Sequence, residues 1–273
     1  MPILRIIFAP HLLWLIKNCD NVVFIFTNIG GKMKKLFISF AAIFSMVIVA
    51  DGHANVKPGE ETGEFHYFNV TDPAGFIAAL DEHYASDCAK KWQKESGAEV
   101  VVMGVLGSVH THFIYVGYKN NEMLEKGRSI VGACPETAKL IKGLSASSST
   151  SDYVSRLGEQ SLEVGDWTKD KFFMKYDFNV KLGHAAHYAK EWTKLMNTLD
   201  ASNSAGLITH RAGSGWMSHF VYIGGDSIDQ LYSTFDANSK TEAFQEFAAN
   251  VSEIRELRNV SLIAPVKAYP SKR

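Results

Sequence analysis

His112-Phe113-Ile114-Tyr115-Val116-Gly117 is a stretch that the chain repeats as His219-Phe220-Val221-Tyr222-Ile223-Gly224. Four of the six positions are identical, and the other two exchange one β-branched residue for another. A Phe-Asn-Val triplet precedes each copy: 43 positions separate Asn69 from His112, and 40 separate Asn179 from His219. Two matching landmarks at nearly equal spacing indicate an internal duplication.

The two halves show the same order of predicted elements. In the first half, strands and helices are predicted over residues 65–70, 73–95, 99–106, 110–118, 123–131, 135–144 and 157–164. In the second half, they are predicted over residues 172–180, 184–199, 205–211, 216–223, 227–235, 241–254 and 260–268. The serine-rich run 145–151 is expected to be a flexible break.

Each half therefore has the ferredoxin-like order β-α-β-β-α-β, which gives an α+β fold with a four-stranded antiparallel sheet and helices on one face. The other face of such a sheet is bare and must be covered. Two tandem repeats can cover each other by packing sheet to sheet. The sequence leaves open whether they do so within one chain, as a monomer with pseudo-dimeric halves, or across a homodimer.

The beginning of the chain has the features of an export signal. Lys34 and Lys35 follow Met33, an apolar run of fifteen residues covers 36–50, and small residues come at 52–54. This pattern is typical of a secretory signal peptide, and the run is short for a membrane span. We therefore expect a mis-assigned leader at 1–32, a signal peptide at 33–54 and repeats at 55–166 and 167–273, with an exported protein in the periplasm or outside the cell. The alternative is a membrane anchor in the leader.

Charge and cysteine content limit the partners and the redox setting. Cleavage after Ala54 would remove five of the 28 basic and two of the 29 acidic residues, and the remaining net charge of −4 includes no basic block. The electrostatic footprint of a nucleic-acid binder is therefore missing. Cys88 and Cys134 remain after cleavage, and in an exported chain such a pair forms either a disulfide or two buried thiols.

The order of elements and the duplication resemble the dimeric α/β-barrel superfamily, which includes antibiotic-biosynthesis-monooxygenase-like domains, here as a tandem fusion. The resemblance implies a ligand or reactive centre in the cleft between a sheet and its helices. It also implies small-substrate oxygenation, with or without haem, as a class of activity. In the haem-degrading branch, an Asn on the first strand acts with a Trp and a His. Asn69 and Asn179 lie on first strands, but Trp216 and His219 share one strand, so that spacing is not reproduced.

The repeated side chains are the first candidates for a site. On a strand, His112 and His219 face one side, and Tyr115 and Tyr222 face the other. A histidine in a cleft can act as a base or contact a ligand, and a tyrosine can orient a ligand in an apolar cavity. Each residue also has a structural interpretation, as a hydrogen-bonded histidine or as a core tyrosine whose hydroxyl has a partner.

Asn69 and Asn179 complete the repeated set, because a buried amide can hold a ligand or a neighbouring backbone group. Metal binding is not predicted: His110 with His112 and His184 with His187 are the closest approaches to ligand spacing, and neither pair comes with the three or four converging ligands that a site needs. No phosphate-binding loop or nucleophile elbow is found.

The sequence thus predicts an exported protein that binds a small apolar or aromatic molecule in a cleft lined by His112, His219, Tyr115, Tyr222 and Trp216, without a resident cofactor. One alternative is a monooxygenase, either cofactor-independent or haem-linked, and a second is a structural or assembly module without a ligand. Because Trp216 and His210 occur only in the second half, we expect a single asymmetric site there.

Overall fold

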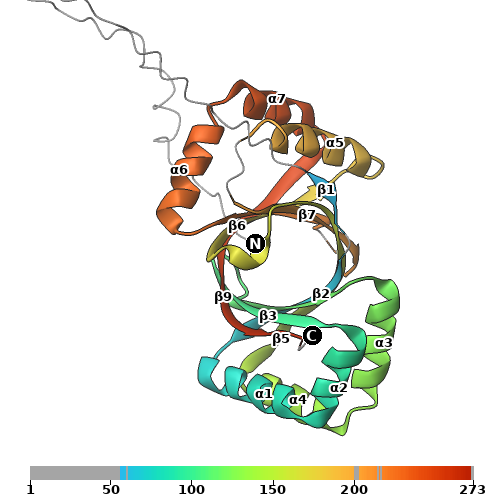
Figure 1. Ribbon diagram of the computed structural model, residues 1–273. Coiled ribbons are helices and arrows are strands. Elements are labelled where there is room, and N and C mark those ends of the chain that lie inside the picture. The colour runs from blue at the N-terminus through green and yellow to red at the C-terminus, as the bar shows by residue number, and fades with distance from the viewer. Residues whose placement is uncertain (1–55, 60, 200–202, 214, 216, 272–273) are drawn as a thin grey trace, which may run out of the picture. The chain divides into compact units, whose positions relative to one another are not determined.

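The computed structural model describes residues 56–59, 61–199, 203–213, 215 and 217–271. The predicted leader and signal peptide, and Trp216, lie outside these residues. Two repeats with the expected order of elements are observed (Figure 1). The first contains β1 Lys57–Pro58, β2 Thr62–Val70, α1 Pro73–Ala85, α2 Asp87–Ser96, β3 Glu99–Leu106, β4 His112–Tyr118, α3 Asn121–Gly132, α4 Pro135–Ala146 and β5 Ser148–Val164. A 3-10 turn, Trp167–Lys169, precedes the second, which contains β6 Phe172–Val180, α5 Ala185–Met196, β7 Ala205–Ala212, β8 His219–Gly225, α6 Ile228–Asn238, α7 Glu242–Val251 and β9 Arg255–Tyr269.

The strands of both repeats form one closed antiparallel barrel. Its order is β5-β2-β4-β3-β9-β6-β8-β7, and β7 pairs back to β5; the short β1 adds to β5. The first four strands belong to the first repeat and the last four to the second. The repeats therefore pair within a single chain, which answers the question that the sequence left open.

Two long strands close the barrel. β5 pairs with β2 of its own repeat over Ser148–Glu159 and with β7 of the other repeat over Leu157–Val164. β9 does the same, pairing with β6 over Arg255–Ile263 and with β3 over Leu262–Tyr269. Register shifts in these ladders are the bulges that let a strand bend from one sheet into the next.

Strand β5 differs from the prediction, because it begins at Ser148 and not at Leu157. The serines that suggested a flexible break form the first part of the strand, and Ser148 and Ser149 pair with Val70 and Asn69 of β2. Serine has a weak intrinsic preference for strands, but pairing with an adjacent strand decides the outcome here.

The first predicted helix is observed as two. Asp72 caps α1 by accepting the Gly75 N–H, with Pro73 at the first helical position, as expected. Ser86 then interrupts the helix with an extended backbone and caps α2 by accepting the Ala89 N–H. Gly97 ends α2 in the left-handed conformation, with φ 67°.

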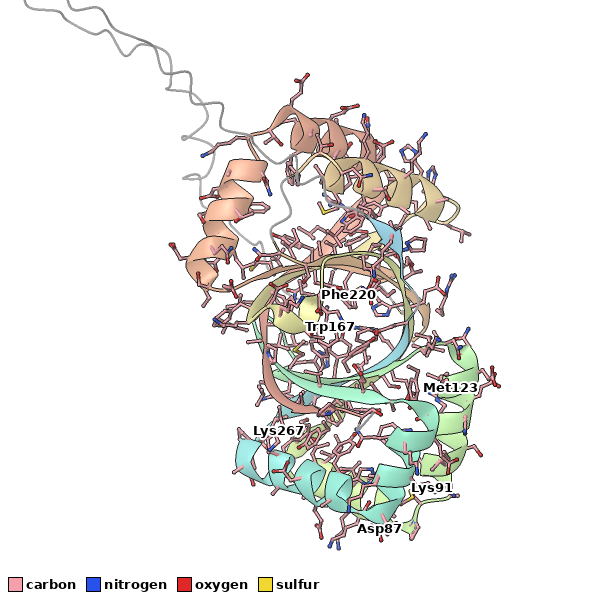
Figure 2. The ribbon with its side chains drawn as sticks, in the orientation of Figure 1. Asp87, Lys91, Met123, Trp167, Phe220 and Lys267 are labelled. Carbon is pink, nitrogen blue, oxygen red and sulfur yellow. A yellow bond between two sulfur atoms is a disulfide. The ribbon has the colours of Figure 1, made fainter. Side chains whose placement is uncertain are left out.

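Side chains alternate between the barrel interior and the helices, so the molecule has three cores. The helix-facing sides of the sheets carry two of them, one under α1–α4 and one under α5 and α7 (Figure 1). The third fills the barrel with Phe65, Tyr67, Val101, Met103, Phe113, Phe173, Ile208, Phe220, Tyr222 and Ile263. Figure 2 shows Trp167 and Phe220 within the ring of strands. The interior at this level retains only ≈ 50 Å³ of space, so it is a packed core and not a channel.

None of the helices in the described part of the chain has the length and apolar composition that crossing a membrane requires.

Candidate functional site

Tyr115 and Tyr222 lie inside the barrel, as part of its packed core. The Tyr115 hydroxyl donates to the Glu61 carboxylate at 2.9 Å, and the Gln160 amide donates to the Tyr222 hydroxyl at 3.0 Å. Burial raises the pKa of both phenols well above its ordinary value. Both tyrosines therefore have the partners that a buried structural phenol requires.

His112 and His219 lie on the opposite, helix-facing side of the sheets, each in its own repeat. Nδ1 of His219 is 2.7 Å from the Ser218 hydroxyl oxygen, which also accepts the Val180 N–H at 2.9 Å. In the first repeat, Thr111 takes the place of Ser218: its hydroxyl is 3.0 Å from Nδ1 of His112 and accepts the Val70 N–H at 2.8 Å. The repeated hydroxyl–histidine pair ties the end of the first strand of each repeat to its neighbour.

The structure thus does not gather the predicted residues into one cleft. Asn69 and Asn179 are part-buried at the ends of β2 and β6, and Trp216 lies outside the described residues. The alternation of strand side chains separates the tyrosines from the histidines, and the barrel separates the two histidines from each other.

Cys88 and Cys134 form a disulfide between the start of α2 and the residue before α4, with Cα atoms 6.0 Å apart. Glu136 joins them in the one cluster of metal-ligand types found among the described residues. Since the two sulfur atoms are bonded to each other, they are not available as thiolate ligands.

A cavity of ≈ 630 Å³ lies between the sheet and the helices of the first repeat. Its floor is the outward face of β2 and β4, and its roof comes from all four helices of the repeat. Apolar side chains form most of its wall: Phe68, Leu80, Tyr84, Trp92, Ile114, Val116, Val131, Leu140, Ile141 and Leu144. Ile141 is 59% exposed and lies at the edge of this cavity.

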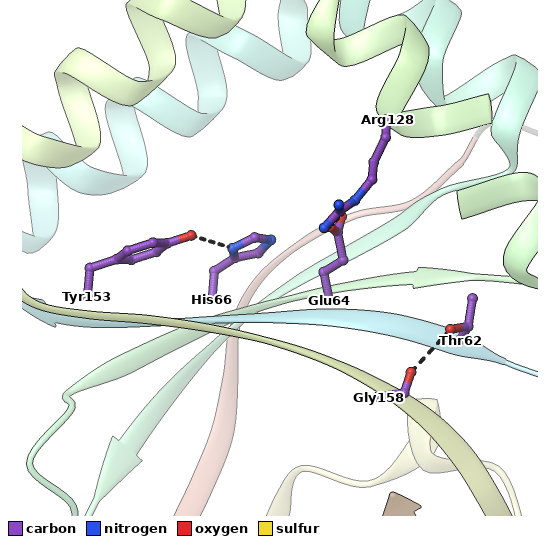
Figure 3. A network of polar contacts seen from close by, with 6 residues as sticks. All are labelled: Thr62, Glu64, His66, Arg128, Tyr153 and Gly158. Atoms are coloured by element: carbon purple, nitrogen blue, oxygen red, sulfur yellow. Dashed lines mark hydrogen bonds and ion pairs between the residues drawn. The ribbon is translucent and has the colours of Figure 1, made fainter. Parts of the chain in front are cut away.

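A small set of polar groups is placed on the cavity floor. Glu64 and His66 lie on the helix-facing side of β2, and Figure 3 shows both pointing from the strand toward the helices. The Glu64 carboxylate is buried and accepts two N–H groups from Arg128 of α3, whose side chain is mostly exposed. Nδ1 of His66 and the Tyr153 hydroxyl of β5 are hydrogen-bonded at 2.7 Å. Burial lowers the pKa of His66, so its imidazole is neutral near pH 7.

His83 of α1 adds a polar atom that lacks a partner. The residue is only 4% exposed, it lines the cavity, and its Nδ1 has no hydrogen-bond partner among the described residues. Burial lowers its pKa as well. A buried ring nitrogen left in this way costs free energy, and a ligand group in the cavity could recover it.

The corresponding cavity of the second repeat is smaller, at ≈ 210 Å³. Aligned on the Phe-Asn-Val triplets, Met174 and Tyr176 take the places of Glu64 and His66. Aligned on the helix caps Asn120 and Ser227, Phe235 takes the place of Arg128. The asymmetry between the repeats is thus real, but the larger and more polar cavity lies in the first repeat, not in the second as expected.

Repeat symmetry directed the sequence prediction to residues that occur twice, and so it missed Glu64, His66, Arg128 and Tyr153. The differences between the two repeats at equivalent positions contained a signal for these residues. His66 stands in the strand predicted over 65–70 and Glu64 directly precedes that strand, where the other repeat has Tyr176 and Met174. Their partners on α3 and β5 are too distant in sequence for pattern reasoning to supply.

Comparison with known proteins supports the architecture. No family model matches the sequence, and none of the curated proteins is similar to it. Among solved structures, an anthrone oxidase-like protein matches with a TM-score of 0.54 and 10% identity, over 80% of this chain and 97% of its own. A proposed monooxygenase from Lactobacillus acidophilus NCFM matches with a TM-score of 0.51 and 12% identity, over 78% and 97%. A haem-binding protein from Thermus thermophilus is similar at a TM-score of 0.46 and 11% identity, over 79% and 94%.

These likenesses are below the identity at which function can be carried over, and they concern the arrangement of elements. They agree with the closed ring of strands, the helices on its outer faces and the repeated β-α-β-β-α-β order. The chain has the dimeric α/β-barrel fold, built as two ferredoxin-like repeats in tandem.

Proposed function

We propose that this protein binds a small, uncharged, largely apolar or aromatic molecule in the sheet–helix cavity of the first repeat, and that it does so after export. The observation that carries the proposal is an apolar cavity of ≈ 630 Å³ with a few convergent polar groups. Such a combination is the usual composition of small-molecule sites, in which apolar walls provide affinity and polar groups fix the orientation.

The polar groups define what the ligand would offer. Glu64 is already paired with Arg128, so the cavity has little net charge to match with an ionic ligand. The neutral His66 and the unpartnered Nδ1 of His83 both suit a hydroxyl or carbonyl group. A flat ring with one such group, of the size of a naphthol, meets these requirements.

Haem is the cofactor that the fold suggests, and the lining residues fit it only in part. His66 and His83 supply imidazoles, which are common iron ligands. The two propionates of haem would need cations, however, and the only cationic side chain that lines this cavity among the described residues is Arg128, which pairs with Glu64. A neutral ligand therefore suits the site better than haem does.

Calorimetric titration of the protein with 2-naphthol tests the proposal, with Gly132→Phe as the blocking variant. Gly132 lines the cavity at its exposed edge, and a Cβ at this position would meet no atom within 4 Å, so a large side chain can be placed there without a backbone clash. We expect the variant to bind 2-naphthol at least tenfold more weakly. Asn238→Phe, at the smaller cavity of the second repeat, is the matched control and should bind as the wild type does.

Native mass spectrometry of the protein secreted from a bacterial host complements the titration, because a retained mass lost in Gly132→Phe would identify the natural ligand. Haemin is titrated in parallel. A Soret band that depends on His83 would replace the proposal with haem binding, and 2-naphthol binding that is equal in Gly132→Phe and the wild type would refute it.

A further inference from the structure

The second polar region of the molecule lies inside the barrel, at the opposite face of the sheet from the cavity of the first repeat. A cavity of ≈ 250 Å³ opens there between β2, β5, β6 and β9. Its wall includes the charged residues Arg156, Lys175, Asp177 and Arg258 together with Tyr67. Arg258 is more exposed and pairs with Glu256, and the other four are more than nine-tenths buried.

The charges of this buried group do not balance. Lys175 and Asp177 form an ion pair, with side chains 3% and 6% exposed. Arg156 takes part in none of the ion pairs formed among the described residues. Its Nε–H donates to the Gly213 carbonyl at 3.3 Å, and its guanidinium lies over the Tyr67 ring at 4.8 Å from the centroid. One positive charge is therefore in excess at a site where desolvation makes an uncompensated ion costly.

Hydrogen-bonding capacity is also unused in this region. The Tyr67 hydroxyl is buried and has no partner among the described residues. Neither ring nitrogen of the nearby His210, which is 7% exposed, has one among them. Burial, together with the positive charges of Arg156 and Lys175, lowers the pKa of His210 to about 3, so the histidine is neutral and adds no positive charge.

Duplication does not account for this arrangement. In the first repeat, the positions of Lys175 and Asp177 are occupied by Phe65 and Tyr67, both of which face the barrel core. The Lys175–Asp177 pair therefore occurs in the second repeat only, and Arg156 comes from β5 of the first repeat. An apolar interior would have been the simpler solution.

We propose that this cavity is a binding site for a small carboxylate anion, held by Arg156 and the Tyr67 hydroxyl beside Lys175. A monoanion matches the single excess charge. The planar guanidinium fork matches a carboxylate in a bidentate geometry. Val105, Phe113 and Met217 are apolar residues of the remaining wall, so they can contact the carbon part of the acid.

Benzoate and benzamide form a matched pair of probes, because they share a shape and differ in charge. We expect titration of the full chain to show saturable binding of benzoate and at least tenfold weaker binding of benzamide. Inorganic phosphate is the third probe: if it binds more tightly than benzoate, the site belongs to an inorganic oxyanion and the carboxylate proposal is overturned.

Single-residue variants test whether benzoate binds in this cavity. Arg156→Lys keeps the charge but loses the fork, and we expect about a tenfold loss of benzoate affinity, since a hydrogen bond to a charged group contributes roughly that factor. Tyr67→Phe keeps the ring, folds without a volume change and should lose several-fold. Arg211→Gln removes an exposed arginine that pairs with Glu159 on the same sheet, and it should leave the affinity unchanged.

Two results would contradict the proposal even if the Arg156 variant failed to fold. The first is a Tyr67→Phe protein that binds benzoate as the wild type does. The second is an equal loss in Arg211→Gln, which would indicate diffuse surface attraction in place of a defined site. The control Arg128→Gln separates this site from the proposed cavity of the first repeat, because Arg128 lines only the latter.

Discussion

The sheet–helix cavities of the two repeats are built on the same elements and differ in content. In the first repeat, Glu64, His66 and Arg128 border ≈ 630 Å³ of space. In the second, Met174, Tyr176 and Phe235 stand at the corresponding positions and border ≈ 210 Å³. The rings of Tyr176 and Phe235 stack with centroids 6.2 Å apart, where the first repeat has an imidazole near an ion pair.

The two repeats differ in how tightly their helix-facing sides are packed and in how much open space they retain. At the two equivalent phenylalanines, Phe178 of the second repeat is 1% exposed and Phe68 of the first is 7% exposed. The first repeat keeps an opening and polar groups on its floor, and its helices are connected by the disulfide Cys88–Cys134. A disulfide of this kind stabilises the fold mainly by constraining the unfolded chain, and it can offset packing lost around an open cavity.

The largest expected effect concerns packing at the two equivalent phenylalanines, Phe178 and Phe68. Phe178→Ala should lower the free energy of unfolding by about 3–5 kcal/mol, the range for a fully buried aromatic residue. Phe68→Ala should cost about 1 kcal/mol less, because Phe68 borders the larger cavity and has fewer contacts to lose. Urea unfolding of the two variants measures the difference. Equal losses would mean that the first repeat is packed as tightly as the second.

A swap of residues between the repeats tests the cavity directly. The double variant Glu64→Met and Arg128→Phe gives the first repeat the residues of the second. We expect it to bind 2-naphthol about a hundredfold more weakly, equivalent to about 2.7 kcal/mol, because the new side chains fill the cavity. The fold should persist, since no charge is left without its partner. Calorimetric titration provides the affinity and circular dichroism the fold; binding that survives the swap would place the ligand elsewhere.

The smallest expected effect is a difference in pH response between His219 and His112. Burial lowers the pKa of His219 to about 4, from an ordinary value of 6.5. The unfolded chain therefore binds a proton that the folded chain does not, so stability is full above pH 6.5 and falls as the pH drops toward 4. Between pH 6.5 and pH 4, the free energy of unfolding of His219→Gln should therefore fall by roughly 1–2 kcal/mol less than that of the wild type.

His112 is less buried, and its pKa is also lowered by burial. His112→Gln should therefore change the pH dependence in the same direction but by a smaller amount. Free energies of unfolding measured between pH 4 and pH 7 for the two variants show which histidine has the larger effect on the pH dependence. A larger effect at His112 would contradict the view that the second repeat is the more tightly packed one.

Much of the fold follows from local patterns in the sequence. The repeated His-Phe-x-Tyr-x-Gly stretch located β4 and β8, and the cap at Asp72 and the glycine at Gly97 marked ends of the helical region. The break at Ser86 and the serine-rich start of β5 were missed. The β5 start depends on pairing with a strand nearly eighty positions away, which no local preference records.

The candidate site was harder to predict from the sequence, because repetition identifies the residues that the fold requires in both repeats. Tyr115, Tyr222, His112 and His219 proved to have packing or hydrogen-bonding partners in both repeats. The residues that distinguish the cavities are those that fail to repeat, such as Glu64 against Met174. Their partners come from other elements, so only the folded chain brings them together.

The crossing of β5 and β9 from one repeat into the other has a consequence for how such a protein can change. In a dimer of identical chains, every substitution is made in both cavities, so a residue that improves binding in one also opens a void in the other. Here the two cavities are encoded separately, while the shared strands keep both on one closed sheet. One repeat is thereby free to specialise, and the other can retain the packing that the specialised repeat has lost.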